Sequence, residues 1–249
     1  MIDKTIDESC HVSVVIPVFN EEDNLEPLID ELQQVLDKLG KKYEVIFIDD
    51  KSTDDSLEVM KKLRETRPFL RIFPHRLNSG ESAGQATGFA HANGEIIITM
   101  DADQQNDPAD IPFLLDALKE NIAAVCGVRR KRMDTIVKRI SSRTWNVFRN
   151  IVTGDKISDG GCTYRAIRRS ALCEIQIFNG MHRFIPTLLR LQGYEVVEIP
   201  INDRPRTRGY SKYGVRNRIW RGITDCFAIY WLRKRSIRGD RIGPEYHSQ

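Results

Sequence analysis

The chain has 249 residues, of which 41% are hydrophobic, and its formal net charge is +3 at pH 7. A chain of this size and composition can bury a full core, which excludes disorder and is compatible with one α/β domain plus an appendage. Its five cysteines are odd in number and include no CxxC pair, which argues against a disulfide framework and a structural zinc site. We therefore expect reduced thiols in the cytosol.

Membrane-spanning and secretory segments are not expected. The first eight residues are acidic and lack the long apolar core of a signal peptide. The longest uncharged apolar stretch elsewhere, residues 226–232, is far shorter than the roughly 20 residues that a helix needs to span a bilayer.

The basic charge is concentrated near the C-terminus. Residues 204–241 contain 12 Lys and Arg against two acidic residues, so the remainder of the chain is net acidic. Such a segment is compatible with a solvated helix face, a nucleic-acid contact or an anchor to anionic lipid.

The hydrophobic pattern predicts alternating strands and helices. Strands are expected at residues 12–18, 43–48, 70–73, 95–100, 123–128 and 195–201, and helices at residues 22–39, 56–64 and 82–92. This order predicts a mostly parallel, doubly wound sheet with helices on both faces.

Polar side chains follow three of these strands, where ligands collect in parallel sheets. They are Asn20-Glu21, Asp49-Asp50 and Asp101-Ala102-Asp103. The last group suits a hard divalent cation held against a diphosphate. A calcium loop is excluded, because Asn106 and Pro112 stand where such a loop has Gly and Glu. A solvated turn that caps a helix after Pro108 remains an alternative.

The sequence lacks the phosphate-binding motifs that are typical of other nucleotide-binding folds. The chain has no GxGxxG after its first predicted strand and no GxxxxGK[ST] motif. Gly80, Gly84 and Gly88 are spaced by four, and within a helical segment this spacing favours close packing over phosphate binding.

Four motifs occur together in order: VVIPVFNEE at residues 14–22, IDDKSTD at 48–54, DADQQNDP at 101–108 and RTRGYSK at 206–212. With them, the chain resembles glycosyltransferase family 2, in its polyprenyl-phosphate (dolichyl-phosphate mannose synthase-like) branch. The resemblance covers most of residues 12–213. It implies a GT-A type nucleotide-diphospho-sugar transferase fold over residues 1–212, followed by a basic amphipathic segment at 213–249.

The resemblance also implies roles for individual residues. Pro17, Phe19 and Glu21 line the nucleoside pocket, Asp50 accepts hydrogen bonds from the base, and Asp101 belongs to the donor site. Asp101, Asp103 and Gln105 bind Mg²⁺ or Mn²⁺, the cations that oxygen ligands suit. The alternative to a binding role for Pro17 and Phe19 is that they end a strand and pack in the core. The alternative for Asp49 is that it only forms a turn.

Basic residues complete the implied site. Asp103, Arg129 and Arg143 form the catalytic group, and the two arginines contact donor and acceptor phosphates. A solvated charge run is the alternative for Arg129. The acceptor phosphate is bound by Arg143, Arg206, Ser211 and Lys212, for which a flexible basic loop is the alternative. Residues 159–165 (DGGCTYR) depart from the Asp-x-x-Ser-Gly-Phe-Arg form common in the branch, so acceptor details and sugar identity stay open.

The implied reaction is inverting, metal-dependent transfer of a sugar from a nucleoside-diphosphate sugar to a polyprenyl phosphate. A lipid monophosphate has a second pKa of about 6, so it needs no general base at neutral pH. Two alternatives remain: a family 2 enzyme that glycosylates a saccharide hydroxyl, and a nucleic-acid-binding protein on a degenerate nucleotide fold. The strand-end carboxylates disfavour the second, so we expect no nucleic-acid partner.

The C-terminal segment has one apolar stripe of helical spacing with cationic borders. The stripe contains Val215, Ile219, Ile223, Phe227 and Tyr230, joined by Trp220 and Trp231. This pattern favours a helix in the lipid interface, and a helix packed on the domain is the alternative. We expect peripheral attachment to the cytoplasmic face of the membrane, through an anionic lipid surface or an integral-membrane partner.

Overall fold

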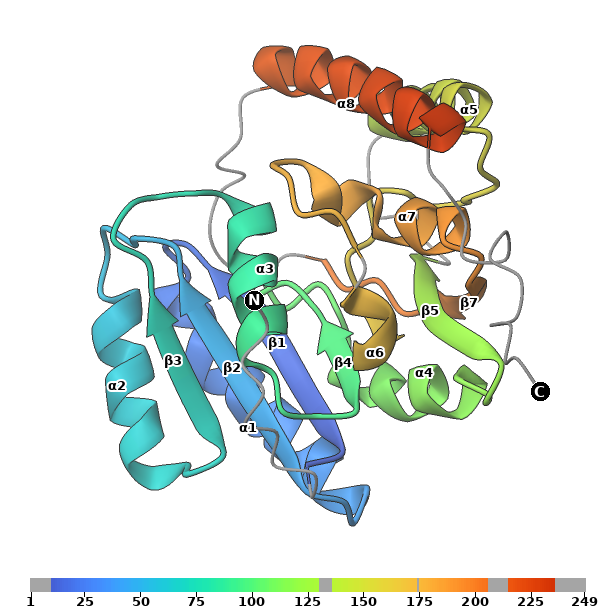
Figure 1. Ribbon diagram of the computed structural model, residues 1–249. Helices are drawn as coiled ribbons and strands as arrows, with labels where there is room; N and C mark the ends of the chain where they lie inside the picture. The colour runs from blue at the N-terminus through green and yellow to red at the C-terminus, as the bar shows by residue number, and fades with distance from the viewer. Residues whose placement is uncertain (1–9, 130–135, 174, 206–214, 236–249) are drawn as a thin grey trace, which may run out of the picture.

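The computed structural model describes residues 10–129, 136–173, 175–205 and 215–235, with the backbone alone for residues 136–143 and 215–221 (Figure 1). The strands are β1 (Val12–Val18), β2 (Tyr43–Asp49), β3 (Leu70–Pro74), β4 (Ile96–Thr99), β5 (Ile122–Arg129), β6 (Arg165–Arg168) and β7 (Glu195–Ile201). The helices are α1 (Glu22–Lys38), α2 (Ser56–Thr66), α3 (Glu81–His91), η1 (Pro108–Asp110), α4 (Ile111–Ala117), α5 (Ile136–Thr153), α6 (Arg169–Leu172), η2 (Met181–Arg183), α7 (Ile185–Leu191) and α8 (Val215–Arg235).

The strands form one sheet of seven in the order β3-β2-β1-β4-β6-β5-β7. Four of the six strand pairs are parallel, so the predicted mostly parallel sheet is confirmed. The exception is β6, a short strand that the hydrophobic pattern does not predict. It lies antiparallel between β4 and β5 and joins the two parts of the sheet.

Helices cover both faces of the sheet, which explains why the central strands are apolar at almost every position. Alternate residues of a strand point to opposite faces. Val14 and Ile16 belong to a core shared with α1, α2 and α4, whereas Val15 belongs to a second core shared with α3, α7 and α8.

Helix α3 lies very close to the sheet because two of its glycines face β1. A Cβ atom at Gly84 would lie 2.8 Å from Cβ of Pro17, and one at Gly88 would lie 2.2 Å from Cγ1 of Val15. Both distances are too short for real carbon contacts, so Gly84 and Gly88 serve close packing, as predicted. The prediction is wrong for Gly80, where an added Cβ would meet no atom within 4 Å and the backbone has a φ of +85°.

Helices α5 and α8 pack side by side at the top of the molecule (Figure 1). Cys226 and Ile229 of α8 are buried in the second core, whereas Phe227, Tyr230 and Trp231 are exposed. The helix therefore has two apolar faces, one packed on the domain and one open. Among the described residues, no helix is long and apolar enough to cross a membrane.

All five cysteines lie within the described residues, and none of them forms a disulfide. Burial raises the pKa of Cys126 to about 11 and that of Cys162 to about 12. These thiols therefore stay protonated at neutral pH and act as small apolar side chains.

Candidate functional site

The carboxyl ends of β2, β1 and β4 lie next to one another, because these three strands are adjacent and parallel. They bring Asp50, Glu21 and Asp101 to one edge of the sheet. Each of the three turns there contains a non-glycine residue with positive φ: Lys51, Asn20 and Gln104. No other described non-glycine residue has such a φ. Backbone strain of this kind costs about 1–3 kcal/mol per residue and concentrates at functional sites.

Asp50 organises the turn between β3 and α3. Its carboxylate accepts hydrogen bonds from the backbone amides of Ser79 (2.8 Å) and Gly80 (2.7 Å), and one oxygen lies 2.9 Å from Nδ1 of His75. A carboxylate has about four acceptor positions, so three contacts leave capacity for a further donor. Asp49 beside it accepts from the backbone amide of Ser52, which confirms its turn-forming role.

The predicted nucleoside-pocket residues Pro17, Phe19 and Glu21 are all partly buried at or just beyond the end of β1. Glu21 accepts a hydrogen bond from the side chain of Asn24 at 2.6 Å, and its backbone amide donates to Oγ of Ser56. These three residues therefore line the same edge of the sheet as Asp50.

The loop after β4 holds the two central carboxylates. Asp103 is buried and accepts a hydrogen bond from the backbone amide of Gln105, while the backbone amide of Asp101 donates to Asn106. Burial of its carboxyl group and the nearby charge of Asp103 together raise the pKa of Asp101 to about 6, against the lowering effect of a hydrogen bond from Thr163. Two acidic groups thus repel each other in a place with little water.

This donor set fits a hard divalent cation. Mg²⁺ is held in proteins by one or two carboxylates, together with water and substrate phosphates, and Asp101, Asp103 and the amide of Gln105 provide such oxygens. Across the described ranges, no group of three or more His, Cys, Asp or Glu side chains could hold a metal alone. The arrangement therefore suits a cation shared with a phosphorylated ligand better than a fully protein-bound ion.

Residues 159–165 lie against this loop, a contact that the sequence pattern does not predict. The hydroxyl of Thr163 donates to Oδ1 of Asp101 at 2.9 Å, and the hydroxyl of Tyr164 donates to the carbonyl of Asp107 at 2.9 Å. Arg165 is fully buried and donates to the carbonyls of His182 and Cys162. The signal that could have revealed these contacts is the departure of residues 162–164 from the common family form.

Arg129 ends β5 and forms a two-point ion pair with Asp159, in which Nε and Nη2 lie 2.7 and 2.9 Å from the carboxylate oxygens. Burial lowers the pKa of Arg129, but the hydrogen bonds and charge of Asp159 outweigh it and raise that pKa above its ordinary value. Arg129 is therefore a fixed, partly buried cation and not part of a solvated charge run.

The other predicted basic residues are not placed. The side chain of Arg143 and the whole of Arg206, Ser211 and Lys212 lie outside the described residues. The chain approaches residues 206–214 from beside the carboxylate loop, because the backbone amide of Arg204 donates to the carbonyl of Gln105 at 3.0 Å. The Arg204 side chain also pairs with Asp107 and with Glu31 of α1.

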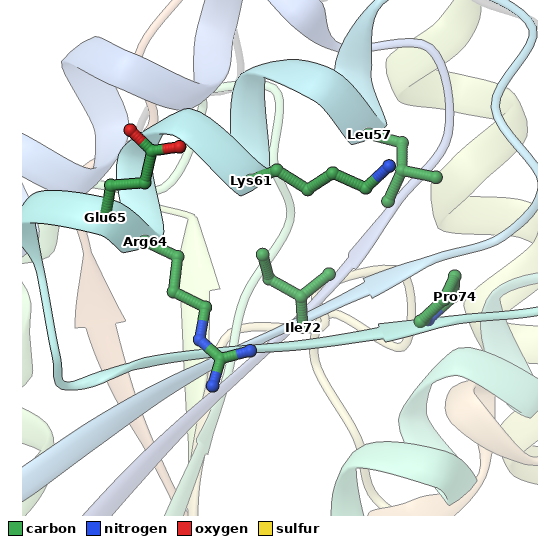
Figure 2. Close-up of a pocket in the computed structure, with 6 residues that line it drawn as sticks. All are labelled: Leu57, Lys61, Arg64, Glu65, Ile72 and Pro74. Carbon is green, nitrogen blue, oxygen red and sulfur yellow. The ribbon is translucent and has the colours of Figure 1, made fainter.

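A separate hollow of about 480 Å³ lies between α2 and the edge strand β3 (Figure 2). Its six lining residues come only from these two elements and include none of the predicted site residues: Leu57, Lys61, Arg64, Glu65, Ile72 and Pro74. We therefore assign the candidate site to the strand-end carboxylates and not to this hollow.

Solved structures share the fold. Glucosyl-3-phosphoglycerate synthase from Mycobacterium tuberculosis, in complex with Mn²⁺, uridine diphosphate and phosphoglyceric acid, matches 92% of this chain and 80% of its own, with a TM-score of 0.66 and 19% identity. The same enzyme with Mg²⁺ and uridine diphosphate matches 90% of this chain and 79% of its own, with a TM-score of 0.63 and 20% identity. This likeness confirms the predicted GT-A architecture.

Sequence comparisons give the family. The chain is 36% identical over 235 residues to the undecaprenyl-phosphate 4-deoxy-4-formamido-L-arabinose transferase of Edwardsiella ictaluri, covering 93% of this chain and 72% of that protein. The enzyme of the same name from Salmonella paratyphi B is 35% identical over the same shares. Residues 13–175 match the model of glycosyl transferase family 2. The strand-end carboxylates, the fold and these matches together show that the chain is a glycosyltransferase and belongs to glycosyl transferase family 2.

Proposed function

We propose that the protein transfers a sugar, with inversion, from a nucleoside-diphosphate sugar to a polyprenyl phosphate. The observation that carries this proposal is the pair Asp101 and Asp103, which lies at the sheet edge beside Asp50 and fits a divalent cation. The product would be a lipid-linked monosaccharide for envelope glycan or lipid A-type modification.

On the donor side, Pro17, Phe19 and Glu21 line the nucleoside pocket, and Asp50 accepts a hydrogen bond from the base. Asp101, Asp103 and Gln105 would hold Mg²⁺ or Mn²⁺, which supplies a Lewis acid for the charge that develops on the leaving diphosphate. The hydrogen bonds from Ser79 and Gly80 keep the Asp50 carboxylate in place before the donor arrives, which limits the ordering needed on binding.

On the acceptor side, the proposed phosphate ligands are Arg143, Arg206, Ser211 and Lys212, and Arg129 stabilises charge between the two substrates. Guanidinium groups suit phosphate oxygens because they donate two parallel hydrogen bonds. A polyprenyl phosphate is largely ionised at neutral pH, so these residues orient a nucleophile that needs no base. The names of the relatives, which specify undecaprenyl phosphate, support this acceptor class.

A transfer assay tests the proposal. Purified protein is incubated with undecaprenyl phosphate and a panel of nucleotide sugars that includes a 4-deoxy-4-formamido-L-arabinose donor, and lipid products are measured by mass spectrometry. We expect one donor to give a lipid-linked sugar with Mn²⁺ or Mg²⁺ and none with excess chelator. Transfer to a saccharide hydroxyl and not to the lipid, or transfer unaffected by the chelator, would contradict the proposal.

The proposed site of action is the cytoplasmic face of the membrane, where the protein binds peripherally to an anionic surface or through an integral-membrane partner. Helix α8 exposes Phe227 (57%) and Trp231 (62%), next to basic residues at 233–235. Exposed aromatic rings bordered by cations suit the lipid interface. The five cysteines, none of which forms a disulfide, suit a reducing compartment.

Liposome flotation with paired variants tests the membrane contact. The double variant Phe227→Ser/Trp231→Ser is expected to bind anionic vesicles at least about tenfold more weakly, because each aromatic ring contributes about 1 kcal/mol or more when it leaves water. The matched control is Phe113→Ser, which changes an equally exposed ring (62%) on α4, a helix that Figure 1 shows well separated from α8. Equal loss of binding in the control, or unchanged binding in the double variant, would contradict a contact through α8.

A further inference from the structure

The loop 101–107 carries the proposed metal ligands, and two hydroxyl groups from another part of the chain hold its ends. Thr163 donates to the carboxylate of Asp101, at the start of the loop, and Tyr164 donates to the carbonyl of Asp107, at its end. Both donors lie in the segment that follows Asp159 and leads into β6.

The strand register explains why these residues meet. In the antiparallel pair of β4 and β6, Ile98 lies opposite Ala166 and Thr99 lies opposite Arg165. Continuing this register by two residues brings Asp101 opposite Thr163. Residues directly opposite each other in an antiparallel pair present their side chains on the same face, so the threonine hydroxyl reaches the carboxylate.

Two further contacts fix the segment itself. The hydroxyl of Thr99 donates to the carbonyl of Thr163 at 2.5 Å, and the backbone amide of Gly127 donates to the carbonyl of Tyr164 at 2.9 Å. Thr163 and Tyr164 are both buried, and Tyr164 packs in the first hydrophobic core. The donors are thus held by β4 and β5 before any ligand binds.

The two residues that carry these hydroxyl groups, Thr163 and Tyr164, differ from the sequence form common in the branch, Asp-x-x-Ser-Gly-Phe-Arg. Thr163 stands where that form has glycine and Tyr164 where it has phenylalanine, and neither of those residues can donate a side-chain hydrogen bond. The two contacts on the loop therefore depend on the hydroxyl groups that this chain has at positions 163 and 164.

We infer that Thr163 and Tyr164 are positioning residues that fix the two ends of loop 101–107, so that Asp101 and Asp103 meet a divalent cation in one geometry. This inference rests on the proposed function, because it concerns the same carboxylates. Groups that orient a metal ligand without touching the metal typically change metal affinity by about 10- to 100-fold when they are removed.

The test measures Mn²⁺ binding directly, by electron paramagnetic resonance of free Mn²⁺ in the presence of uridine diphosphate. Thr163→Val keeps the shape of the side chain and removes the hydroxyl, and we expect it to raise the Kd for Mn²⁺ about 10-fold or more. Thr163→Ser keeps the hydroxyl and should stay within about twofold of the unmodified protein. Tyr164→Phe should also raise the Kd, by a smaller factor because it acts on the backbone of the loop.

Matched controls separate this role from general damage. Thr153→Val removes another buried hydroxyl, which donates to a carbonyl within α5, and Tyr43→Phe removes a hydroxyl that donates to Asp37. Both should leave the Kd for Mn²⁺ unchanged, and thermal unfolding should show that every variant is folded.

The outcomes distinguish the two proposals. If the unmodified protein binds Mn²⁺ and Thr163→Val, or its replacement Thr163→Ala where the valine variant does not fold, binds it equally well, the inference about Thr163 is wrong while the proposed function stands. An unchanged Kd in Tyr164→Phe overturns the part that concerns Tyr164. Failure of the unmodified protein to bind Mn²⁺ with uridine diphosphate overturns both the inference and the proposed metal site.

Discussion

Asp103→Asn is expected to lower the rate of sugar transfer on the order of 10³-fold, because it removes a fixed anionic ligand from the site where leaving-group charge is stabilised. The amide has nearly the same shape as the carboxylate, so the loop should keep its fold. The charge of Asp103 raises the pKa of Asp101, so the two carboxylates repel each other. Removing one charge should therefore leave the melting temperature unchanged or higher.

The measurement is the initial rate of lipid-linked product at saturating donor and Mn²⁺, alongside thermal unfolding. Asp116→Asn is the matched control, because Asp116 is exposed on α4 and belongs to no part of the candidate site. The control should keep its full rate. A near-normal rate for folded Asp103→Asn would exclude Asp103 from the catalytic role proposed above.

Gly88→Ala is expected to destabilise the protein by about 2 kcal/mol, although alanine is normally the better helix former by about 1 kcal/mol. The added methyl group would lie 2.2 Å from Cγ1 of Val15 and 3.2 Å from Cδ1 of Ile48. Val15 is fully buried and branched at Cβ, so it has little freedom to move. For a protein of this size the loss corresponds to a melting temperature lower by about 4–8 °C.

Urea unfolding of a double-mutant cycle identifies the cause. Val15→Ala alone should destabilise by leaving a cavity, but together with Gly88→Ala it should cost at least about 1 kcal/mol less than the sum of the single changes. Additive effects, or a melting temperature that rises in Gly88→Ala, would show that helix propensity and not contact with β1 governs this position.

The sequence predicted the strands whose residues are buried on both faces, because such strands are continuous apolar runs. All six expected strands are present, with ends that differ by no more than one residue. It did not predict β6, which has only four residues and begins and ends with arginine. The burial of Arg165 depends on the carbonyls of His182 and Cys162, and no local pattern reveals such partners.

The candidate site was predictable in its acidic residues and not in their partners. Asp50 and Asp101 follow apolar strands, so their position at the sheet edge follows from topology alone. The contacts of Asp50 with His75 and Ser79, and of Asp101 with Thr163, join segments 25 or more residues apart. Such contacts depend on the register of strands and the path of loops, which hydrophobic spacing does not encode.

The strand order also has a consequence for how the chain acquires its structure during synthesis. Strands β1 to β4 pair among themselves, so this half of the sheet is complete once residue 99 has emerged. Strand β5 is made next, but both of its neighbours, β6 and β7, come later in the chain. Because long-range strand pairing is slow, we expect the apolar surface of β5 to remain exposed until the last third of the polypeptide has been synthesised. During this interval the nascent chain is most prone to aggregation, so chaperone binding has its largest effect then.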